Sequence, residues 1–444
     1  MALEGQRRAE SPPDDRDFFP YHRDEATFED LDNYKRYGLH PIIPGDSLPK
    51  PSTCVSHPQK KPRYTIIVKI GFGAFSTVWL AQDADTRQFF AVKVGQGKAD
   101  ADLSTEARIL QHIRQSTGRG REHIIHLYDL FTIKGPNGYH ECFATEVVVP
   151  LSSINMEFSK KFTPNRLNRQ IALGFDHLHS QKIAHGDPHY GNVGIAVPQI
   201  NQFNGFDLMD HIGGELEMSP VIPVNASYPM ETVPAYMVGS VSIFDFLRAQ
   251  NAFPTYDQQD IRILDFGRAF WVDTPRPLKG ACPMAFRAPE AAMFGPDMSN
   301  GEIGCAWSQP SDIWAIGCLF FRIETEFPLF YPRWSAKEHI IGHTDLSGPV
   351  PLEWRKYWPQ SADSRAPPTE LDPRKIEEAW RLRLPTNSTL RSLLMRMINT
   401  KPEDRPSIRE ILRDPYFGHN QSSNDTYDSC GDQEADEVDR TIGE

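Results

Sequence analysis

The chain has 444 residues, of which 39% are hydrophobic and 24% charged, so it can bury a sizeable core. Its formal net charge of −12 argues against nucleic-acid binding as the main function, and no window of about 18 apolar residues suggests a membrane span. The six cysteines form no C-x-x-C pair, which argues against a zinc site or a disulfide framework and favours a reducing compartment.

Residues 1–63 are polar and rich in proline. We expect them to form an extended lead-in that is only partly ordered. The first residues contain no apolar run of the kind found in secretory signals, so no signal peptide is expected.

From Tyr64 the sequence becomes rich in β-branched and aromatic residues, which favours a sheet. YTIIVKIGFGAFSTVWLAQD predicts a hairpin around a glycine-rich tip, and QFFAVKV predicts the next strand. DLSTEARILQHIRQ predicts a helix, because Leu103, Ala107, Leu110 and Ile113 recur at helical spacing. Two more strands are expected in HIIHLYDLFTI and ECFATEVVV, on either side of a turn that contains glycine.

After Pro150 the predicted structure is mainly helical. RLNRQIALGFDHLHSQ has one apolar face, and IRILDFGRAFW returns to a strand and a loop. Residues 200–259 lie between them, and we treat them as an insertion because a structureless loop of that length is unusual. Helices follow in SDIWAIGCLFFRIE, STLRSLLMRMI and SIREILRD. Residues 419–444 hold eight acidic residues and one basic residue, which predicts a disordered acidic tail.

Gly71, Gly73, Ser76 and Val78 surround the tip of the predicted hairpin. Small residues at such a tip let backbone N–H groups close over phosphates. An ordinary β-turn explains this motif alone equally well. A strand rather than a helix follows it, so it is not a dinucleotide-binding fingerprint.

Lys93 lies in the next predicted strand, flanked by apolar residues, where a lysine needs an anionic partner. Glu106, in the helix that follows, is a candidate for that partner. A Lys–Glu pair that also touches phosphate would explain both residues. The alternative is a surface lysine and a solvated glutamate.

Residues 183–195, IAHGDPHYGNVGI, have the pattern of a catalytic loop. Asp187 can orient an attacking hydroxyl and accept its proton, and Asn192 can bind magnesium. Asp265, in a DFG motif after a β-branched strand, can hold magnesium that bridges phosphates. A lone DFG is common by chance, but all these motifs in this order are not.

Together these residues resemble the eukaryotic protein kinase fold, over about residues 64–418 apart from the insertion. FRAPEAAMFG resembles the family's Ala-Pro-Glu segment, and the resemblance implies that Glu290 pairs with Arg405. SDIWAIGC resembles the buried helix whose aspartate, here Asp312, anchors the catalytic loop. The implied fold class is α+β and bilobal, with a small β-rich N-lobe (64–147) and a larger helical C-lobe (150–418).

The sequences LHPIIPGDSL, RYTIIVKIGFGAFSTVWLAQD and LDFGRAFWV resemble the SR-protein kinases, which phosphorylate serines in Arg/Ser-rich splicing factors. The insertion before Asp265 is a feature of that group, and its short length, VPAYMV and the HGD-type loop resemble fungal members. The resemblance implies a serine/threonine protein kinase that uses ATP and Mg²⁺, with Arg/Ser-rich proteins as a substrate class. It also implies a monomer of the cytoplasm, the nucleus or both, without direct contact with nucleic acid or membrane.

The resemblance also assigns roles to residues. Lys93, paired with Glu106, would hold the α- and β-phosphates, and Asn192 and Asp265 would hold magnesium. Asp187 would orient the acceptor hydroxyl, and His189 would face the γ-phosphate. The adenine would lie against the segment from Glu146 to Val148, with Thr145 as gatekeeper. The implied nucleotide-binding residues are Ile70, Gly71, Gly73, Ser76, Val78, Ala91, Lys93, Thr145, Glu146 and Val148.

Gly186 departs from the family pattern. It replaces the arginine that in many kinases binds a phosphorylated activation loop. Between Asp265 and Glu290 the one hydroxyl candidate is Thr274, so switching by phosphorylation of this segment is not expected. Thr274→Ala should leave the rate nearly unchanged in a kinase assay.

His189 also departs, because the family has a lysine whose charge faces the transferred phosphate. Losing one preorganised donor of this kind typically costs about 2.7–4 kcal/mol. Histidine, with an unperturbed pKa of about 6.5, is mostly neutral at pH 7, although a nearby triphosphate favours its charged form. If imidazolium supplies the charge, His189→Lys should raise activity more at pH 8 than at pH 6. The alternative is a neutral histidine that hydrogen-bonds to the backbone.

Two other classes of protein share some of these motifs. Small-molecule phosphotransferases of the aminoglycoside and choline kinase type use loops such as HGDLHPGN. They lack the Ala-Pro-Glu segment and the buried helix with its Arg405 partner, and both are present here. A weakly active pseudokinase that serves as a binding scaffold usually lacks Lys93, Asp187 or Asp265, and all three are present.

Overall fold

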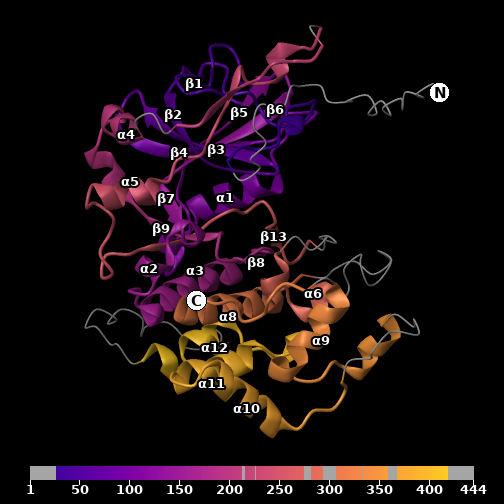
Figure 1. Cartoon of the computed structure of the whole chain (residues 1–444). Helices are drawn as coiled ribbons and strands as arrows, with labels where there is room; N and C mark the ends of the chain where they lie inside the picture. Colours follow the sequence, from indigo (N-terminus) through magenta and orange to yellow (C-terminus); the bar gives the residue numbers. More distant parts are fainter. Residues whose placement is uncertain are drawn as a thin grey trace, which may run out of the picture.

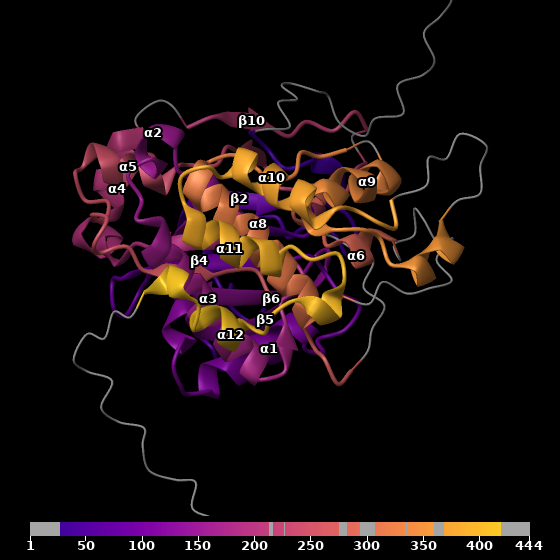
Figure 2. The same ribbon diagram turned by 90° about the horizontal axis from the view of Figure 1, so that it is seen from below.

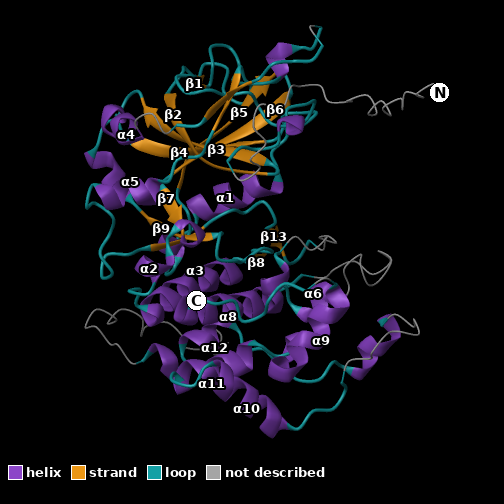
Figure 3. Ribbon diagram, viewed as in Figure 1, coloured by secondary structure: helices purple, strands orange, loops and turns teal. Residues whose placement is uncertain are grey.

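The computed structural model describes residues 27–212, 216–225, 227–274, 282–293, 307–333, 335–358 and 368–418. The molecule has two lobes, a smaller one that carries most of the strands and a larger one that is mainly helical (Figures 1 and 3). The α+β, bilobal arrangement expected from the sequence is therefore confirmed. The start of the lead-in (1–26) and the acidic tail (419–444) lie outside the described residues.

A six-stranded antiparallel sheet forms the small lobe, in the order β1-β2-β3-β4-β6-β5. Its β-branched and aromatic residues face a buried side where Trp79 and Phe131 are almost fully enclosed. The helix α1 (Thr105–Gln115) packs beside this sheet (Figure 1). The strands are β1 (Ser47–Leu48), β2 (Tyr64–Gly73), β3 (Ser76–Asp83), β4 (Phe89–Gly95), β5 (Leu127–Gly135) and β6 (Gly138–Thr145).

The centre of the large lobe is α8 (Gln309–Thr325), which is buried on nearly all sides, as its apolar sequence requires. The helices α3 (Pro164–Ser180) and α11 (Ser388–Met397) pack against it. In the view from below, α11 lies over α8 (Figure 2). The other helices of this lobe are α2 (Met156–Ser159), α6 (Pro289–Met293), α9 (Ala336–Ser347), α10 (Pro373–Arg383) and α12 (Ile408–Leu412).

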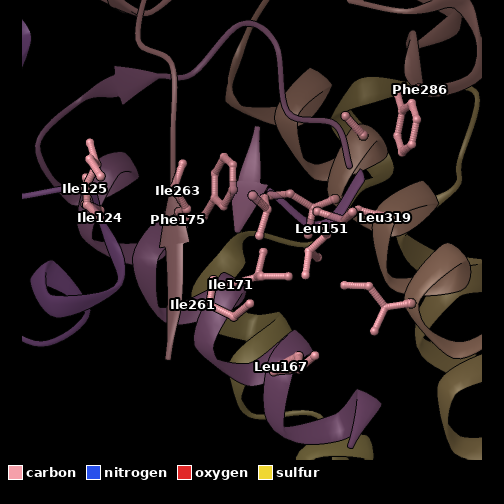
Figure 4. Close-up of a cluster of buried hydrophobic side chains, with 14 of the residues drawn as sticks. Ile124, Ile125, Leu151, Leu167, Ile171, Phe175, Ile261, Ile263, Phe286 and Leu319 are labelled. Carbon is pink, nitrogen blue, oxygen red and sulfur yellow. The ribbon is translucent and has the colours of Figure 1, made fainter. Parts of the chain in front are cut away.

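Two small sheets lie where the lobes meet. One has the order β12-β9-β7 and the other pairs β13 with β8. Apolar side chains from α3 and β12 interlock beneath them, including Ile171, Phe175, Ile261 and Ile263 (Figure 4). This core gives the loop between β8 and β9 a rigid base. The strands are β7 (Val148–Pro150), β8 (Ile183–Ala184), β9 (Val193–Ala196), β12 (Ile261–Ile263) and β13 (Phe270–Trp271).

The described part of the insertion is folded. It contains α4 (Gly205–Ile212), β10 (Met218–Pro220), β11 (Tyr236–Val238) and α5 (Ile243–Ala249), with β10 and β11 paired in an antiparallel way. Its helices lie beside the small-lobe sheet (Figure 1). Short 3-10 helices occupy Leu31–Asn33, Arg121–His123, Leu151–Ser153, Pro198–Gln202, Met230–Thr232, Met284–Phe286, Leu352–Tyr357, Pro402–Asp404 and Pro415–Phe417.

Candidate active site

Lys93 meets two carboxylates from distant parts of the chain. Its Nζ lies 2.7 Å from Oε1 of Glu106 and 3.0 Å from Oδ1 of Asp265. Ser104 caps α1 by accepting a hydrogen bond from the N–H of Ala107, which places Glu106 in the first turn. Burial opposes the charged form of Lys93, but the two carboxylates together raise its pKa above the usual value. The ammonium group is therefore permanently charged at neutral pH.

The backbone of Asp265 turns its carboxylate toward Lys93. Asp265 has φ of 55°, in the left-handed region, and the N–H of Gly267 donates to Oδ1 over 3.2 Å. Burial alone would raise the pKa of Asp265, but Lys93 lowers it to about 2. The neighbouring Phe266 is fully buried, with its ring 5.1 Å from that of His185. Asp265 is thus a fixed anion at the junction of the lobes.

Asp312 in α8 anchors the loop between β8 and β9. Its carboxylate accepts hydrogen bonds from the N–H groups of His185 (2.8 Å) and Gly186 (3.1 Å). The side chains of Trp307 (2.8 Å) and His179 (3.1 Å) also contact it. Asp312 is completely buried, so within the described part of the chain these donors satisfy its carboxylate. The anchoring role that the family resemblance implied for Asp312 is confirmed.

The structure gives a physical reason for Gly186. Its φ is +81°, and a Cβ at this position would lie 2.5 Å from the backbone oxygen of Arg268. Neither the backbone angle nor the space suits the arginine that many kinases have here. Thr274, the one hydroxyl candidate after Asp265, is exposed and donates to the carbonyl of Trp271 over 2.8 Å.

Asp187 and Asn192 face each other across the loop. The Nδ2 of Asn192 donates to the carbonyl oxygen of Asp187 over 3.0 Å. The N–H of Leu264 donates to the carbonyl of Asn192 over 2.8 Å, which brings Asn192 next to Asp265. Among the described residues, Oδ1 of Asp187 is buried and accepts no hydrogen bond. Such an atom is suited to receive the hydrogen of an incoming hydroxyl.

His189 is held as a neutral side chain. Its Nδ1 accepts a hydrogen bond from the N–H of Gly191 over 3.0 Å, so the single proton of the neutral ring lies on Nε2. Nε2 lies 3.8 Å from Oδ1 of Asp187. Burial lowers the pKa of His189, against the opposing effect of Asp187. This arrangement favours the neutral, backbone-bonded histidine over an imidazolium.

The glycine-rich hairpin joins β2 and β3, with Gly73 paired to Ser76 and Gly71 paired to Val78. A Cβ added to Gly71 or Gly73 would meet no atom within 4 Å. The chain itself therefore leaves open space over both glycines, which suits the close approach of a ligand's phosphates.

The remaining predicted nucleotide contacts lie on neighbouring strands. Ala91 lies in β4 and pairs with Thr145 of the neighbouring strand β6. Ile70 lies in β2 and is half-buried. Glu146 points its carboxylate away, because Oε1 accepts from the N–H of His126 (2.9 Å) and from Nε of Arg262 (2.8 Å). The carboxylate of Glu146 is thus engaged by groups of its own chain. Val148 begins β7 and is half-buried.

The donors at this junction fit magnesium. Carboxylate and amide oxygens are the ligands that this ion prefers. Because Nδ2 of Asn192 is bonded to the backbone, its Oδ1 is the atom left to bind an ion, and no described residue donates to that oxygen. Oδ1 of Asp265 lies on the adjacent strand end and already holds a cation, Lys93.

Sequence reasoning did not place Cys282 at the site. Burial raises the pKa of its thiol, and the neighbouring carboxylate of Asp187 raises it further. Cys282 thus stays protonated beside the loop. The signal that could have identified it is its place eight residues before Glu290, on the segment that leads into α6.

The expected pair of Glu290 and Arg405 is present. Both terminal guanidinium nitrogens of Arg405 donate to the carboxylate of Glu290 over 2.8 Å, and the hydroxyl of Ser311 donates to the same carboxylate. Arg405 also lies over the ring of Trp314. This buried cluster ties α6 to α8.

Residues 64–200 and 242–417 match the family model described as protein kinase domain. A serine/threonine protein kinase of Aspergillus fumigatus is 25% identical over 80% of this chain and 84% of its own. The serine/threonine-protein kinase SRPK of Physarum polycephalum is 25% identical over 88% of this chain and 91% of its own. Human SRSF protein kinase 3 is 32% identical over 39% of this chain and 30% of its own.

A solved kinase-domain structure has the same fold, with a TM-score of 0.52 and 18% identity over 84% of this chain and 99% of that one. Across the described ranges, no helix is long and apolar enough to cross a membrane.

Proposed function

The chain belongs to the protein kinase domain family, and on this premise we propose that it transfers the γ-phosphate of ATP to hydroxyl groups of Arg/Ser-rich proteins. It is a serine/threonine protein kinase, as are its relatives from Aspergillus fumigatus and Physarum polycephalum. The proposed substrate class rests on the resemblance to SR-protein kinases and on the names of two relatives, SRPK and SRSF protein kinase 3. A small-molecule phosphotransferase and a scaffold are not favoured.

One observation carries the proposal for the site. Lys93 in β4 contacts Glu106 in α1 and Asp265 after β12, although Asp265 lies 172 positions further along the chain. A positive charge of this kind, held between two carboxylates beside an open glycine-rich turn, suits the binding of a polyphosphate. In the proposal Lys93 binds the α- and β-phosphates while Glu106 keeps it in place.

Asn192 and Asp265 would hold magnesium, and the bound ion would supply positive charge along the phosphates. The hydroxyl oxygen of the substrate bonds to the γ-phosphorus as the bond from that phosphorus to ADP breaks. The hydroxyl proton passes to the carboxylate of Asp187 and then to water. The Nε2–H of His189 donates toward the transferred group. Positioning and charge stabilisation supply most of the rate enhancement in such a reaction.

We also propose that the protein acts as a monomer in the cytoplasm, the nucleus or both, on protein substrates rather than on nucleic acid or membranes. The net charge of −12 supports the exclusion of nucleic acid.

The test offers magnesium and labelled ATP together with an Arg/Ser peptide, a generic basic protein, an acidic peptide and an aminoglycoside. Asp187→Ala is the control that separates real transfer from contamination. Label on the Arg/Ser peptide, lost in Asp187→Ala, is the expected result. Label on the aminoglycoside alone, or equal label with the Asp187→Ala variant, would overturn the proposal.

A further inference from the structure

Lys69 is a charged residue buried inside the small lobe. It lies in β2, directly before Ile70 and Gly71 of the glycine-rich hairpin, and only 1% of its surface is exposed. Its Nζ lies 2.5 and 2.7 Å from the two carboxylate oxygens of Glu29 and 2.8 Å from the carbonyl oxygen of Val238. The hydroxyl of Tyr34 donates to the same carboxylate over 2.5 Å. We call Glu29, Tyr34, Lys69 and Val238 the Lys69 cluster.

Both partners of Lys69 lie outside the segments that match the kinase family model. Glu29 and Tyr34 belong to the lead-in, and Val238 belongs to β11 of the insertion. The matched segments, 64–200 and 242–417, thus hold a buried lysine but not its counter-charge. A buried lysine without a partner is strongly unfavourable, so the small lobe of this chain depends on both added segments.

The lead-in and the insertion also bind each other. Nδ2 of the buried Asn137, in the turn between β5 and β6, donates to the carbonyls of Leu39 and Thr232, each over 2.7 Å. Leu39 is part of the lead-in, and Thr232 is part of the insertion. The two segments share a small apolar core made by Tyr34, Leu39, Val221, Val233 and Met237. They therefore form one unit against the sheet.

This unit holds the free edge of β2. Along this edge of β2, the strand β1 pairs with Tyr64 and Thr65 but does not extend to the glycine-rich end. Along the opposite edge, β3 pairs with β2 up to Gly73. Further along the free edge, the N–H of Val241 in the insertion donates to the carbonyl of Lys69 over 2.8 Å. The pairing of β2 with β3 shifts register between Lys69 and Gly71. A shift of this kind redirects a strand, so what is fixed at Lys69 sets where the hairpin points.

We propose that the Lys69 cluster positions the glycine-rich hairpin, so that the lead-in and the insertion together set the affinity of this kinase for the phosphates of its nucleotide. Glu29 and Lys69 act through Ile70 to Gly73 and are positioning residues. The inference rests on the proposed function, because it assumes that the hairpin covers a bound nucleotide.

The test measures the Kd for ATP–Mg²⁺ by titration, and the KM for ATP and for the peptide, in the full chain. Glu29→Gln removes the counter-charge and keeps the size of the side chain. Glu231→Gln is the matched control, because Glu231 is an exposed glutamate of the insertion. For Glu29→Gln we expect the Kd and KM for ATP to rise at least about fivefold, the lower end of ordinary coupling between sites. The KM for the peptide should change by less than about twofold, because the hairpin, not the large lobe, is displaced.

Tyr34→Phe is a milder variant that removes only the hydroxyl bonded to Glu29, and it decides the question if Glu29→Gln does not fold. It should shift the affinity for ATP in the same direction by a smaller factor. Unchanged affinity for ATP in a folded Glu29→Gln variant would overturn the inference and leave the proposed function intact. If Glu29→Gln does not fold, unchanged affinity in Tyr34→Phe would do the same. Failure of the unmodified chain to bind ATP–Mg²⁺ would overturn both.

Discussion

His189 is the residue of the catalytic loop whose chemistry the structure changes most. Its Nδ1 accepts a hydrogen bond from the N–H of Gly191, and a proton on Nδ1 would remove that bond. A Cβ on Gly191 would lie 2.9 Å from Cε1 of His189, so the small residue keeps the ring in place. Burial also lowers the pKa of His189. The loop therefore presents a neutral Nε2–H donor where most kinases present a full charge.

We predict that His189→Lys raises kcat by on the order of 10²-fold, the usual effect of one preorganised charged donor. Because the N–H of Gly191 donates to Nδ1 and burial lowers the pKa of His189 below its usual value of about 6.5, the ring carries no charge at pH 7 or at pH 8, so the gain should be similar at both values. Steady-state rates with saturating ATP measure it, with His57→Lys as the control on an exposed histidine. A gain confined to pH 8 would show instead that imidazolium forms when the nucleotide is bound.

At the scale of elements, the pair of Glu290 and Arg405 joins α6, α8 and the segment before α12. Arg405 has no exposed side-chain surface, and Glu290 is nearly as buried. We predict that Glu290→Gln lowers the free energy of unfolding by about 3–5 kcal/mol, because it leaves a buried guanidinium without its counter-charge. Denaturant unfolding measures this, with the exposed Glu403→Gln as control. A loss below about 1 kcal/mol, typical of surface pairs, would mean that water reaches Arg405.

Elements with strong local patterns could be predicted from the sequence. The hairpin, β4, α1 and α8 follow from β-branched runs and helical spacing, and motifs at their ends indicated which residues would meet. Lys69 could not be understood in this way. In β2 it shares a strand face with the half-buried Thr65 and Ile67, so the pattern predicts a solvent-facing lysine. Only the fold of two distant segments buries it.

In the candidate active site, too, some features follow from sequence motifs and others depend on contacts between distant segments. Lys93, Asp187 and Asp265 were indicated by motifs, because each motif has a fixed relation to a strand or a loop. The tautomer of His189 and the approach of Cys282 to Asp187 depend on single contacts between a loop and a segment far along the chain. No periodicity encodes such contacts, so only coordinates show them.

At the scale of the whole molecule, several histidines are buried in neutral form. Burial lowers the pKa of His40, His140 and His343, and it lowers that of His339 to about 4. The rings of His339 and His343 lie 3.7 Å apart in the core beside Trp314 and Phe330. In an unfolded chain each of them would take up a proton near pH 6.5.

We therefore predict that the protein loses stability as the pH falls from 7.5 to 5. The folded state binds fewer protons than the unfolded state below pH about 6.5, so each such histidine contributes a loss of up to about 1.4 kcal/mol per pH unit. The dependence of Tm on pH measures this. His343→Phe should reduce the slope, because phenylalanine fits among aromatic rings and does not titrate, whereas His57→Phe at an exposed position should not. An unchanged slope in His343→Phe would contradict this account.

The dependence of Lys69 on Glu29 has a practical consequence for anyone who wants to express the catalytic unit alone. A recombinant piece that starts at Tyr64, where the family match begins, would contain the lysine and lack the carboxylate that neutralises it. Such a piece is expected to give low soluble yield and to be cleaved readily by proteases near its nucleotide loop. The smallest useful gene fragment should therefore start upstream of residue 29 and keep the insertion.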